Sequence, residues 1–382
     1  MLTKFEVKNY KNFKDKIVVD LRNTSGYKFN SECVQKGVIS KAIIYGRNAT
    51  GKTNLGKAMI DIVTLFWDVA ALNIADNYLN ADTQESEVFY SYTFQFANDE
   101  IVFEYTRNSD RVLQTEVFYV NGKKVYDIDF SKGEAYFGDL GLIGAESANI
   151  EIYKKSIKNQ ESNIESNPYS FAKWIIGNVI ISNNSLIRAM VEFVKKMKMG
   201  TVKNTETSMA KKDYELLITG LQNEQELKRL EKFLNDMGVE CRLVLKKLPD
   251  GKYELYFQHE RLVPFYENAS SGSLSLTKLY FILRNALITT SFLYLDEFDA
   301  YYHYEMAESL VNFFKSNYPK IQIIMTTHNT NLMSNELMRP DCLFILSGSG
   351  TLTALCDATE RELREGHNLE KMYISGEFRE YE

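Results

Sequence analysis

The sequence predicts an α/β fold built around a phosphate-binding loop, with an antiparallel β arm and a helical insertion. Three observations support this expectation. The apolar run 42–45 leads into a glycine-containing loop at 46–53, and a helical pattern of apolar residues follows the loop. Alternation with period two from 89 to 126 is typical of antiparallel strands. Two further apolar runs, 291–295 and 321–326, are typical of buried strands in a parallel sheet.

The composition is that of an ordinary globular protein. The chain has 382 residues, which suggests roughly two to three domain-sized units or one elaborated α/β domain. The formal net charge is −6, so any contact with nucleic acid would need a local basic patch. The four cysteines lack the spacing of a zinc site or a disulfide framework. The N-terminal segment has no signal-like apolar region, and no run reaches the ~18 apolar residues of a membrane span, which predicts a cytoplasmic protein with no membrane partner.

The loop at 46–53 matches the pattern G-x-x-x-x-G-K-[ST], in which the backbone cradles phosphates. Its two glycines let successive N–H groups point into one concavity. Lys52 can reach the β- and γ-phosphates, and the Thr53 hydroxyl can bind Mg²⁺. A glycine-containing turn can match the pattern by chance, but the preceding strand and following helix favour a nucleotide site of the P-loop NTPase type. The predicted nucleotide-binding residues here are Gly46, Arg47, Asn48, Ala49, Thr50, Gly51, Lys52, Thr53 and Asn54.

Three units are expected along the chain. Residues 1–144 form a lobe with the phosphate loop and the β arm, 145–238 form a mostly helical insertion, and 239–382 complete the α/β body. The alternating aromatics of the arm are expected to form a core rather than a binding platform. The basic and aromatic hairpin tip at 9–14 has two interpretations of equal weight: a solvated turn, or a surface that touches adenine or ribose.

A pair of acids follows the apolar run 291–295. A buried strand that ends in Asp-Glu is the Walker B pattern, and ligands of an open parallel sheet bind at the carboxyl ends of its strands. Asp296 is therefore expected to hold Mg²⁺, directly or through water. Glu297, on the opposite phase of the strand, is expected to polarise the attacking water. The alternative, an acidic strand end at the surface, loses weight because the phosphate loop is present.

Two weaker signals complete the candidate site. His328 follows the apolar run 321–326, and it either hydrogen-bonds the γ-phosphate or the attacking water or is a packed structural histidine. Ser270, Ser271 and Gly272 form a turn before a helical pattern, where free N–H groups and the positive end of the helix dipole favour an anion. Serine is also a good N-cap, so this turn alone indicates little.

In this order the motifs resemble the ABC-type ATPase head shared by SMC-like repair ATPases and OLD-type ATPases. The resemblance is closer to the compact AAA-family ATP-binding proteins of bacterial phage-defence and abortive-infection operons. It covers both ends of the chain and leaves only about 145–238 without family motifs. The matching segments are 5–13, 46–54, 256–259, 270–272, 295–299 with His303, 327–329, 339–341 and 368–376.

The resemblance implies a site shared between two copies of the chain. Ser270 and Gly272 would act on the γ-phosphate of ATP held by the other copy, and Asp299 would belong to the D-loop across that interface. His328 would be the switch histidine. The chain departs from the family at 300–304, where the family has a small residue, Leu, His and Pro, and its signature is Ala-Ser-Ser-Gly-Ser rather than Leu-Ser-Gly-Gly-Gln.

The resemblance further implies an ATPase that uses ATP and Mg²⁺, dimerises around ATP, and senses or regulates a separate effector protein from a neighbouring gene in anti-phage defence. OLD-type relatives carry a TOPRIM nuclease after the head, and the residues after Gly350 are too few for that domain. The alternative is an SMC-like DNA-repair or chromosome-maintenance ATPase whose heads clamp DNA. An ATPase rate stimulated by duplex DNA, with a steep salt dependence, would favour this alternative.

Overall fold

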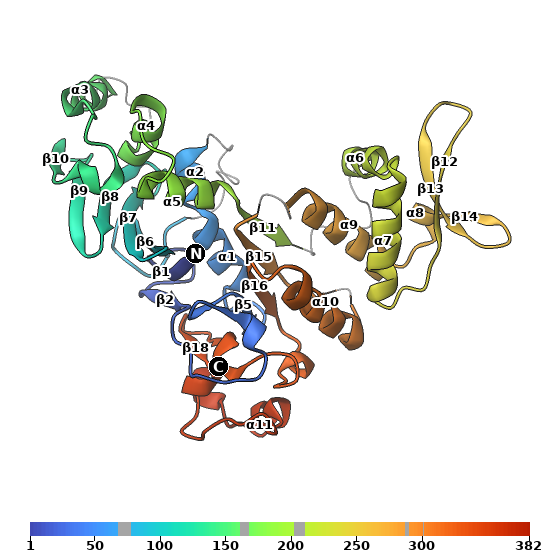
Figure 1. Ribbon diagram of the computed structural model, residues 1–382. Coiled ribbons are helices and arrows are strands. Elements are labelled where there is room, and N and C mark those ends of the chain that lie inside the picture. The colour runs from blue at the N-terminus through green and yellow to red at the C-terminus, as the bar shows by residue number, and fades with distance from the viewer. Residues whose placement is uncertain (68–77, 161–167, 202–210, 287–289, 301) are drawn as a thin grey trace.

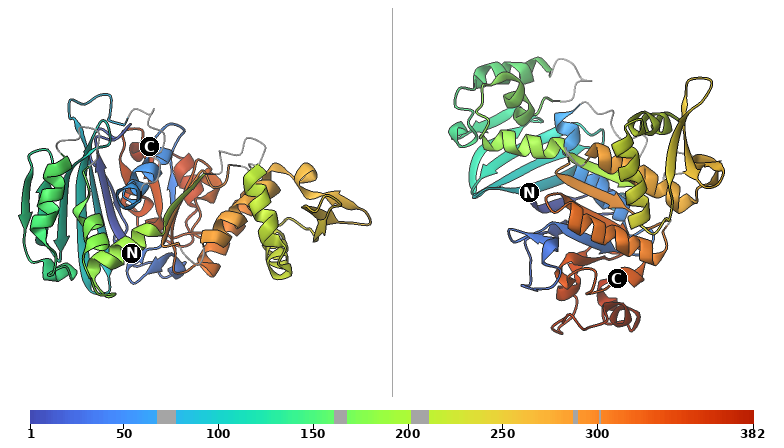
Figure 2. Two further views of the ribbon diagram at one scale, coloured as in Figure 1. Left: turned by 90° about the horizontal axis from the view of Figure 1, so that it is seen from above. Right: turned by 45° about the vertical axis from the view of Figure 1, so that its right-hand side comes forward.

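The structure is a computed structural model that describes residues 1–67, 78–160, 168–201, 211–286, 290–300 and 302–382. Its two largest sheets enclose helix α1 (Lys52–Ile60), and a smaller lobe projects from the far edge of one of them (Figures 1 and 2). The architecture is therefore an α/β body with an antiparallel β arm and a helical insertion, as predicted.

The central sheet has six strands in the order β11-β15-β16-β5-β17-β18. The first five run parallel to one another, and only β18 is antiparallel. Strands β5, β15 and β16 are buried along their whole length, as expected for a sheet covered on both faces. Because they are parallel neighbours, their carboxyl ends share one edge. The strand bounds are β5 (Lys41–Tyr45), β11 (Met197–Thr201), β15 (Phe292–Asp296), β16 (Gln322–Thr327), β17 (Leu343–Leu346) and β18 (Leu352–Ala354).

The second sheet contains the predicted β arm. It is antiparallel, in the order β10-β9-β8-β7-β6-β1-β2, and the hairpins predicted at 98–99 and 121–122 join β6 to β7 and β8 to β9. The arm aromatics Tyr90, Tyr92, Phe94, Phe103 and Tyr105 are buried, which confirms that they form a core. The strand bounds are β1 (Leu2–Lys8), β2 (Ile17–Asp20), β6 (Glu87–Phe96), β7 (Asp99–Asn108), β8 (Leu113–Val120), β9 (Lys123–Asp129) and β10 (Glu134–Phe137).

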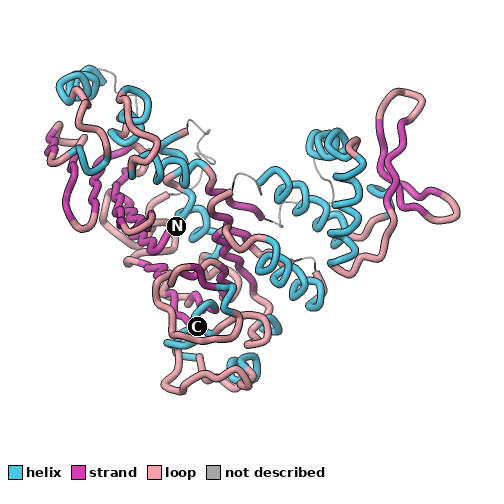
Figure 3. The backbone as a smooth tube through the Cα atoms, in the orientation of Figure 1, coloured by secondary structure: helices cyan, strands magenta, loops and turns pink. Residues whose placement is uncertain are grey.

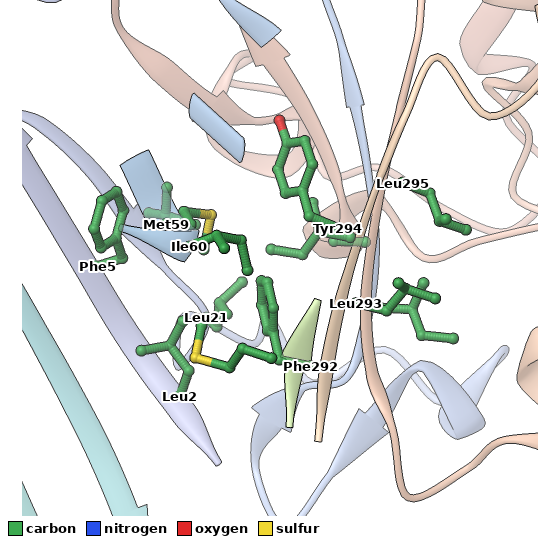
Figure 4. Packing of buried hydrophobic residues seen from close by; sticks show 14 of the residues in the cluster. Leu2, Phe5, Leu21, Met59, Ile60, Phe292, Leu293, Tyr294 and Leu295 are labelled. Atoms are coloured by element: carbon green, nitrogen blue, oxygen red, sulfur yellow. The ribbon is translucent and has the colours of Figure 1, made fainter. Parts of the chain in front are cut away.

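The hydrophobic core between the two sheets is shown in Figure 4. Side chains from β1, α1 and β15 meet there, so the helix after the phosphate loop is packed against both sheets. The residues labelled on these elements include Leu2, Phe5, Met59, Ile60, Phe292 and Tyr294.

Residues 145–238 contain helices α3 to α7, as predicted, but also one strand that the sequence did not reveal. Strand β11 pairs in parallel with β15, from Met197 opposite Phe292 to Thr201 opposite Asp296. Its sequence, Met-Lys-Met-Gly-Thr, lacks the continuous apolar run that marks the inner strands. Lys198 therefore lies in an edge strand of the central sheet.

The projecting lobe consists of α6 to α9 and the small antiparallel sheet β12-β13-β14 (Figure 3). Helix α7 packs against α9, with the rings of Phe233 and Tyr280 5.5 Å apart. Among the described residues no helix is both long and apolar enough to cross a membrane. The remaining bounds are α2 (Val63–Phe66), α3 (Ile150–Gln160), α4 (Phe171–Asn178), α5 (Leu186–Lys195), α6 (Lys211–Leu221), α7 (Glu224–Asp236), α8 (Phe265–Asn268), α9 (Ser271–Ala286), α10 (Tyr304–Asn317), α11 (Leu369–Ile374), β3 (Val34–Gln35), β4 (Val38–Ile39), β12 (Leu243–Lys247), β13 (Tyr253–Gln258) and β14 (Leu262–Pro264).

The close approach of α1 to β15 depends on Gly56. A Cβ atom at this position would lie 2.4 Å from Cε1 of Tyr294. The Tyr294 ring is fixed in turn, because it is buried and its hydroxyl donates a hydrogen bond to the Lys52 carbonyl oxygen at 2.6 Å. The helix that begins in the phosphate loop is therefore held at a defined distance from the central sheet.

We expect Gly56→Ala to lower the free energy of unfolding by about 1–3 kcal/mol, because the added methyl group overpacks the contact with Tyr294. Gly177→Ala is the matched control, since Gly177 also lies in a helix but its Cβ position has no neighbour within 4 Å. The control should change stability by less than about 1 kcal/mol. Urea unfolding followed by circular dichroism measures both, and equal midpoints for the two variants would contradict the packing argument.

Candidate nucleotide site

The candidate site lies at the shared carboxyl edge of β5, β15 and β16. The Thr53 hydroxyl donates a hydrogen bond to Oδ2 of Asp296 at 2.6 Å, and the Thr326 hydroxyl donates to Oδ1 of the same carboxylate at 2.9 Å. Thr326 also accepts a bond from the Glu297 backbone N–H at 2.8 Å. Asp296 is only 1% exposed, so its charge is buried among hydroxyl donors. Residues far apart in sequence thus meet at one point.

The phosphate loop is curled around the Lys52 side chain. The Lys52 ammonium donates hydrogen bonds to the carbonyl oxygens of Gly46 at 2.6 Å and Arg47 at 2.9 Å. Gly51 has φ = +106°, a left-handed conformation that glycine adopts without a steric penalty. A Cβ atom at Gly46 would lie 2.6 Å from the Thr50 hydroxyl oxygen. Both glycines of the motif are therefore required by the shape of this loop.

Glu297 stands just outside β15, because the strand ends at Asp296. Its φ of +47° is uncommon for a residue with a side chain, and its relative exposure is 6%. We predicted that strand alternation would set the direction of the Glu297 side chain. That prediction is wrong, because Glu297 lies outside the strand. The left-handed turn sets it instead. Non-glycine residues in this region are found where the surrounding structure imposes the strain, often at functional sites.

Asp299 and His328 lie at the same edge as Asp296. Oδ2 of Asp299 accepts a hydrogen bond from the Thr327 hydroxyl at 2.7 Å, and Asp299 is buried. Burial raises the pKa of this carboxyl, and the hydrogen bond from Thr327 and, to a smaller extent, the proximity of His328 oppose that rise. His328 follows the end of β16 and is exposed. Both residues are thus brought to the site, although the side chain of Asp299 is turned toward its own sheet in this conformation.

The Ser-Ser-Gly turn is not brought to the phosphate loop of its own chain. Ser270 and Ser271 are exposed, and the Ser270 hydroxyl accepts a hydrogen bond from the Ser273 N–H at 3.1 Å, as an N-cap does. Figures 1 and 2 show that α9 extends from the central sheet to the projecting lobe, and its first residues lie at the lobe.

The structure adds residues that sequence reasoning missed. Thr326 donates a hydrogen bond to Asp296. The only sequence feature that pointed to this role was the pair of threonines before His328. Asn12, in the hairpin tip at 9–14, donates a hydrogen bond from Nδ2 to the Thr50 carbonyl oxygen at 2.9 Å. Tyr10 and Phe13 of this tip are buried, so the tip is neither a fully solvated turn nor an aromatic surface open to adenine.

The central sheet is parallel, with a phosphate loop after β5, an Asp-Glu pair after β15 and β16 between these two strands. This arrangement defines an α/β P-loop NTPase. The sequence comparison agrees, because the family described as "AAA domain, putative AbiEii toxin, Type IV TA system" matches residues 41–334. The chain belongs to this family of AAA ATPases.

Solved structures with a similar fold include SMC head domains. One, an SMC head bound to the C-terminal winged-helix domain of ScpA, is 17% identical, with a TM-score of 0.48, and the match covers 93% of this chain and 97% of that one. The head from Thermotoga maritima is 14% identical, with a TM-score of 0.45 and coverages of 92% and 98%. A head with an extended coiled coil from Pyrococcus furiosus is 15% identical, with a TM-score of 0.47 and 99% of each chain covered. No curated protein matches the chain.

The buried carboxyl of Asp299 predicts a pH effect on stability. Since the folded pKa lies above the usual value of 3.8, the folded state binds the proton more tightly, and this contribution is lost as pH rises through the folded pKa. We therefore expect Asp299→Asn to gain stability relative to wild type as pH is raised from about 4 to about 7. Urea midpoints across this range provide the measurement.

Asp129→Asn is the control for this experiment. Burial acts to raise the pKa of Asp129, but hydrogen bonds from Lys132 and Ser131 outweigh it, so the pKa is lowered. The sign is then reversed: the stability contributed by Asp129 is lost as pH falls through its lowered folded pKa, below the usual value of 3.8. Relative to wild type this variant should therefore lose stability as pH rises through that lower range and change little from about 4 to about 7. Parallel pH profiles for the two variants would contradict the assignment of Asp299 as a buried carboxyl whose pKa is raised on folding.

Proposed function

We propose that this chain is an ATPase that binds Mg²⁺·ATP at the phosphate loop and hydrolyses it in a dimer of two heads. The observation that supports this most directly is the contact between Thr53 and Asp296, 2.6 Å between oxygens. It joins the hydroxyl that follows the phosphate-loop lysine to the carboxylate that ends the buried strand. These are the two protein groups that phosphate-loop enzymes use to hold a metal beside the phosphates.

The oxygen donors present fit Mg²⁺. A hydroxyl and a carboxylate are hard ligands, and this ion is usually held by one or two carboxylates together with waters and substrate phosphates. Thr53 and Asp296 would hold it, and Thr326 would orient the carboxylate through its bond to Oδ1. When bound, the ion supplies charge neutralisation at the β- and γ-phosphates.

The other residues act on the phosphates and on water. Backbone N–H groups of residues 46–54 and the Lys52 ammonium bind the phosphates, since the ammonium can exchange its carbonyl partners for phosphate oxygens. Glu297 orients the attacking water and accepts its proton, and His328 contacts the γ-phosphate or that water. Catalysis of this kind consists mainly of positioning and charge stabilisation.

A second copy of the chain supplies the rest of the site. Ser270, Ser271 and Gly272 of one head contact the γ-phosphate held by the other, and Asp299 joins this interface when its segment turns outward. The exposed position of Ser270 and Ser271, away from the loop of their own chain, supports this arrangement. Each head is built mainly from 1–144 and 239–382, but β11 of the insertion 145–238 adds an edge strand to its central sheet, and β12 to α9 belong to the projecting lobe.

The biological role proposed is that of a cytoplasmic sensor or regulator of a separate effector from a neighbouring gene, in anti-phage defence. The description of the family, which refers to a toxin of a type IV toxin–antitoxin system, supports a role in such a two-component arrangement. If the heads instead clamp DNA, duplex DNA should stimulate ATP hydrolysis, with a strong dependence on salt.

Lys52→Ala should weaken ATP binding by at least about tenfold, because it removes a charged hydrogen-bond donor from the phosphate site. Lys57→Ala is the matched control, since Lys57 lies on the same helix outside the loop motif and its loss should leave affinity near wild type. Isothermal titration with ATP and Mg²⁺ provides the measurement. Wild-type affinity and turnover in Lys52→Ala would refute the assignment of the loop.

Glu297→Gln should retain ATP binding while hydrolysis falls by about 10²–10⁴-fold, since the amide cannot accept the proton from water. ATP should then hold the variant as a closed dimer, which light scattering detects as a doubling of mass. Glutamine has nearly the shape of glutamate, so folding should be unaffected. A variant that hydrolyses ATP normally, or that remains monomeric with ATP, would count against this role.

A further inference from the structure

The turn between β1 and β2 reaches across to the phosphate loop through one side chain, Asn12. Its Nδ2 donates a hydrogen bond to the Thr50 carbonyl oxygen at 2.9 Å, and its Oδ1 accepts one from Nδ2 of Asn54 at 2.7 Å. The carboxamide therefore binds the loop on both sides of Gly51, once through the backbone and once through a side chain.

The same carboxamide lies directly against Gly51. A Cβ atom on Gly51 would be 2.2 Å from Nδ2 of Asn12 and 2.9 Å from its Cγ. No side chain fits between the two residues. The left-handed conformation of Gly51 and the position of Asn12 thus depend on each other, and the loop cannot shift at Gly51 without displacing Asn12.

The turn that carries Asn12 is anchored in the arm sheet. Tyr10 and Phe13 are buried, and the Tyr10 ring packs edge-on against Tyr78 at 5.5 Å. Nδ2 of Asn9 donates hydrogen bonds to the carbonyl oxygens of Glu85 at 2.9 Å and Glu87 at 2.8 Å. Asn12 is consequently presented from a fixed base that belongs to the β arm and not to the central sheet.

We infer that Asn12 is a positioning residue that holds the phosphate loop in its binding shape before nucleotide arrives. Because a loop already fixed in its bound conformation loses less entropy when a ligand binds, this clamp increases affinity for the phosphates. It also makes the β arm a structural support of the nucleotide site. The inference rests on the proposed function for its consequence on ATP, whereas the contacts of Asn12 with the loop do not depend on that function.

Two measurements on Asn12→Ala test the clamp in the full-length chain. Without nucleotide, amide hydrogen exchange in peptides that span 46–54 should become faster by roughly tenfold, the effect of losing two hydrogen bonds. With ATP and Mg²⁺, the Kd should rise by a similar factor, and KM should change by a larger factor than kcat, because the residue acts on binding and does not touch the reacting atoms.

Asn108→Ala is the matched control. Asn108 lies at another turn of the same arm sheet, and its Oδ1 accepts two hydrogen bonds, from the N–H groups of Asp110 and Val112, both at 3.0 Å. It should leave exchange in 46–54 and the Kd for ATP at wild-type values.

The outcomes separate this inference from the proposed function. Unchanged exchange in 46–54 for Asn12→Ala, or an equal increase across the whole chain, overturns the clamp whether or not ATP binds. If the loop exchanges faster in Asn12→Ala but wild type binds no ATP, the clamp stands and the proposed function fails. If ATP binds with wild-type affinity to Asn12→Ala, the role of the clamp in affinity is overturned.

Discussion

Thr53 and Asp296 can meet only because β5, β16 and β15 are parallel neighbours that end at one edge of the central sheet. The strands come from distant parts of the chain, and β16 must lie between the other two to deliver Thr326 to Asp296. A shift of either pairing by one residue would reverse the faces to which these side chains point. The chemistry proposed for the site thus depends on sheet register, which the buried apolar strands specify.

Helix α1 transmits this arrangement to the β arm. The carbonyl oxygen of its first residue, Lys52, accepts a hydrogen bond from the hydroxyl of Tyr294 in the central sheet. Near the other end of the helix, the carbonyl oxygen of Ala58 accepts one at 2.8 Å from the hydroxyl of Tyr92 in the arm. Just beyond the helix, Asp61 accepts a hydrogen bond from Tyr105 at 2.8 Å and lies 3.4 Å from Arg107, inside the arm core. The phosphate loop is therefore fixed through its helix to both sheets, and Asn12 adds a third attachment.

The sequence predicted well those features that have a local pattern. The phosphate loop, the parallel strands β15 and β16, and the arm hairpins have continuous apolar runs, period-two alternation or turn residues. Three features without a local sequence pattern were not predicted. Strand β11 has no run of its own and is a strand because β15 lies beside it, Glu297 is turned by a backbone conformation that no pattern reveals, and Asn12 is defined by its fit against Gly51. The predicted roles of Glu297, His328, Asp299 and Ser270 to Gly272 stay predictions.

In the proposed dimer each phosphate loop is half of a site, completed by the Ser-Ser-Gly turn of a second copy. Mixing two inactive variants tests this claim most directly: Lys52→Ala, which lacks the loop lysine, and Ser270→Arg, which blocks the turn. If the halves come from different copies, the mixture should recover about a quarter of the wild-type ATPase rate, because half of the dimers are mixed and each contains one intact site. Full activity of Ser270→Arg alone, or a mixture no more active than its components, would contradict the account.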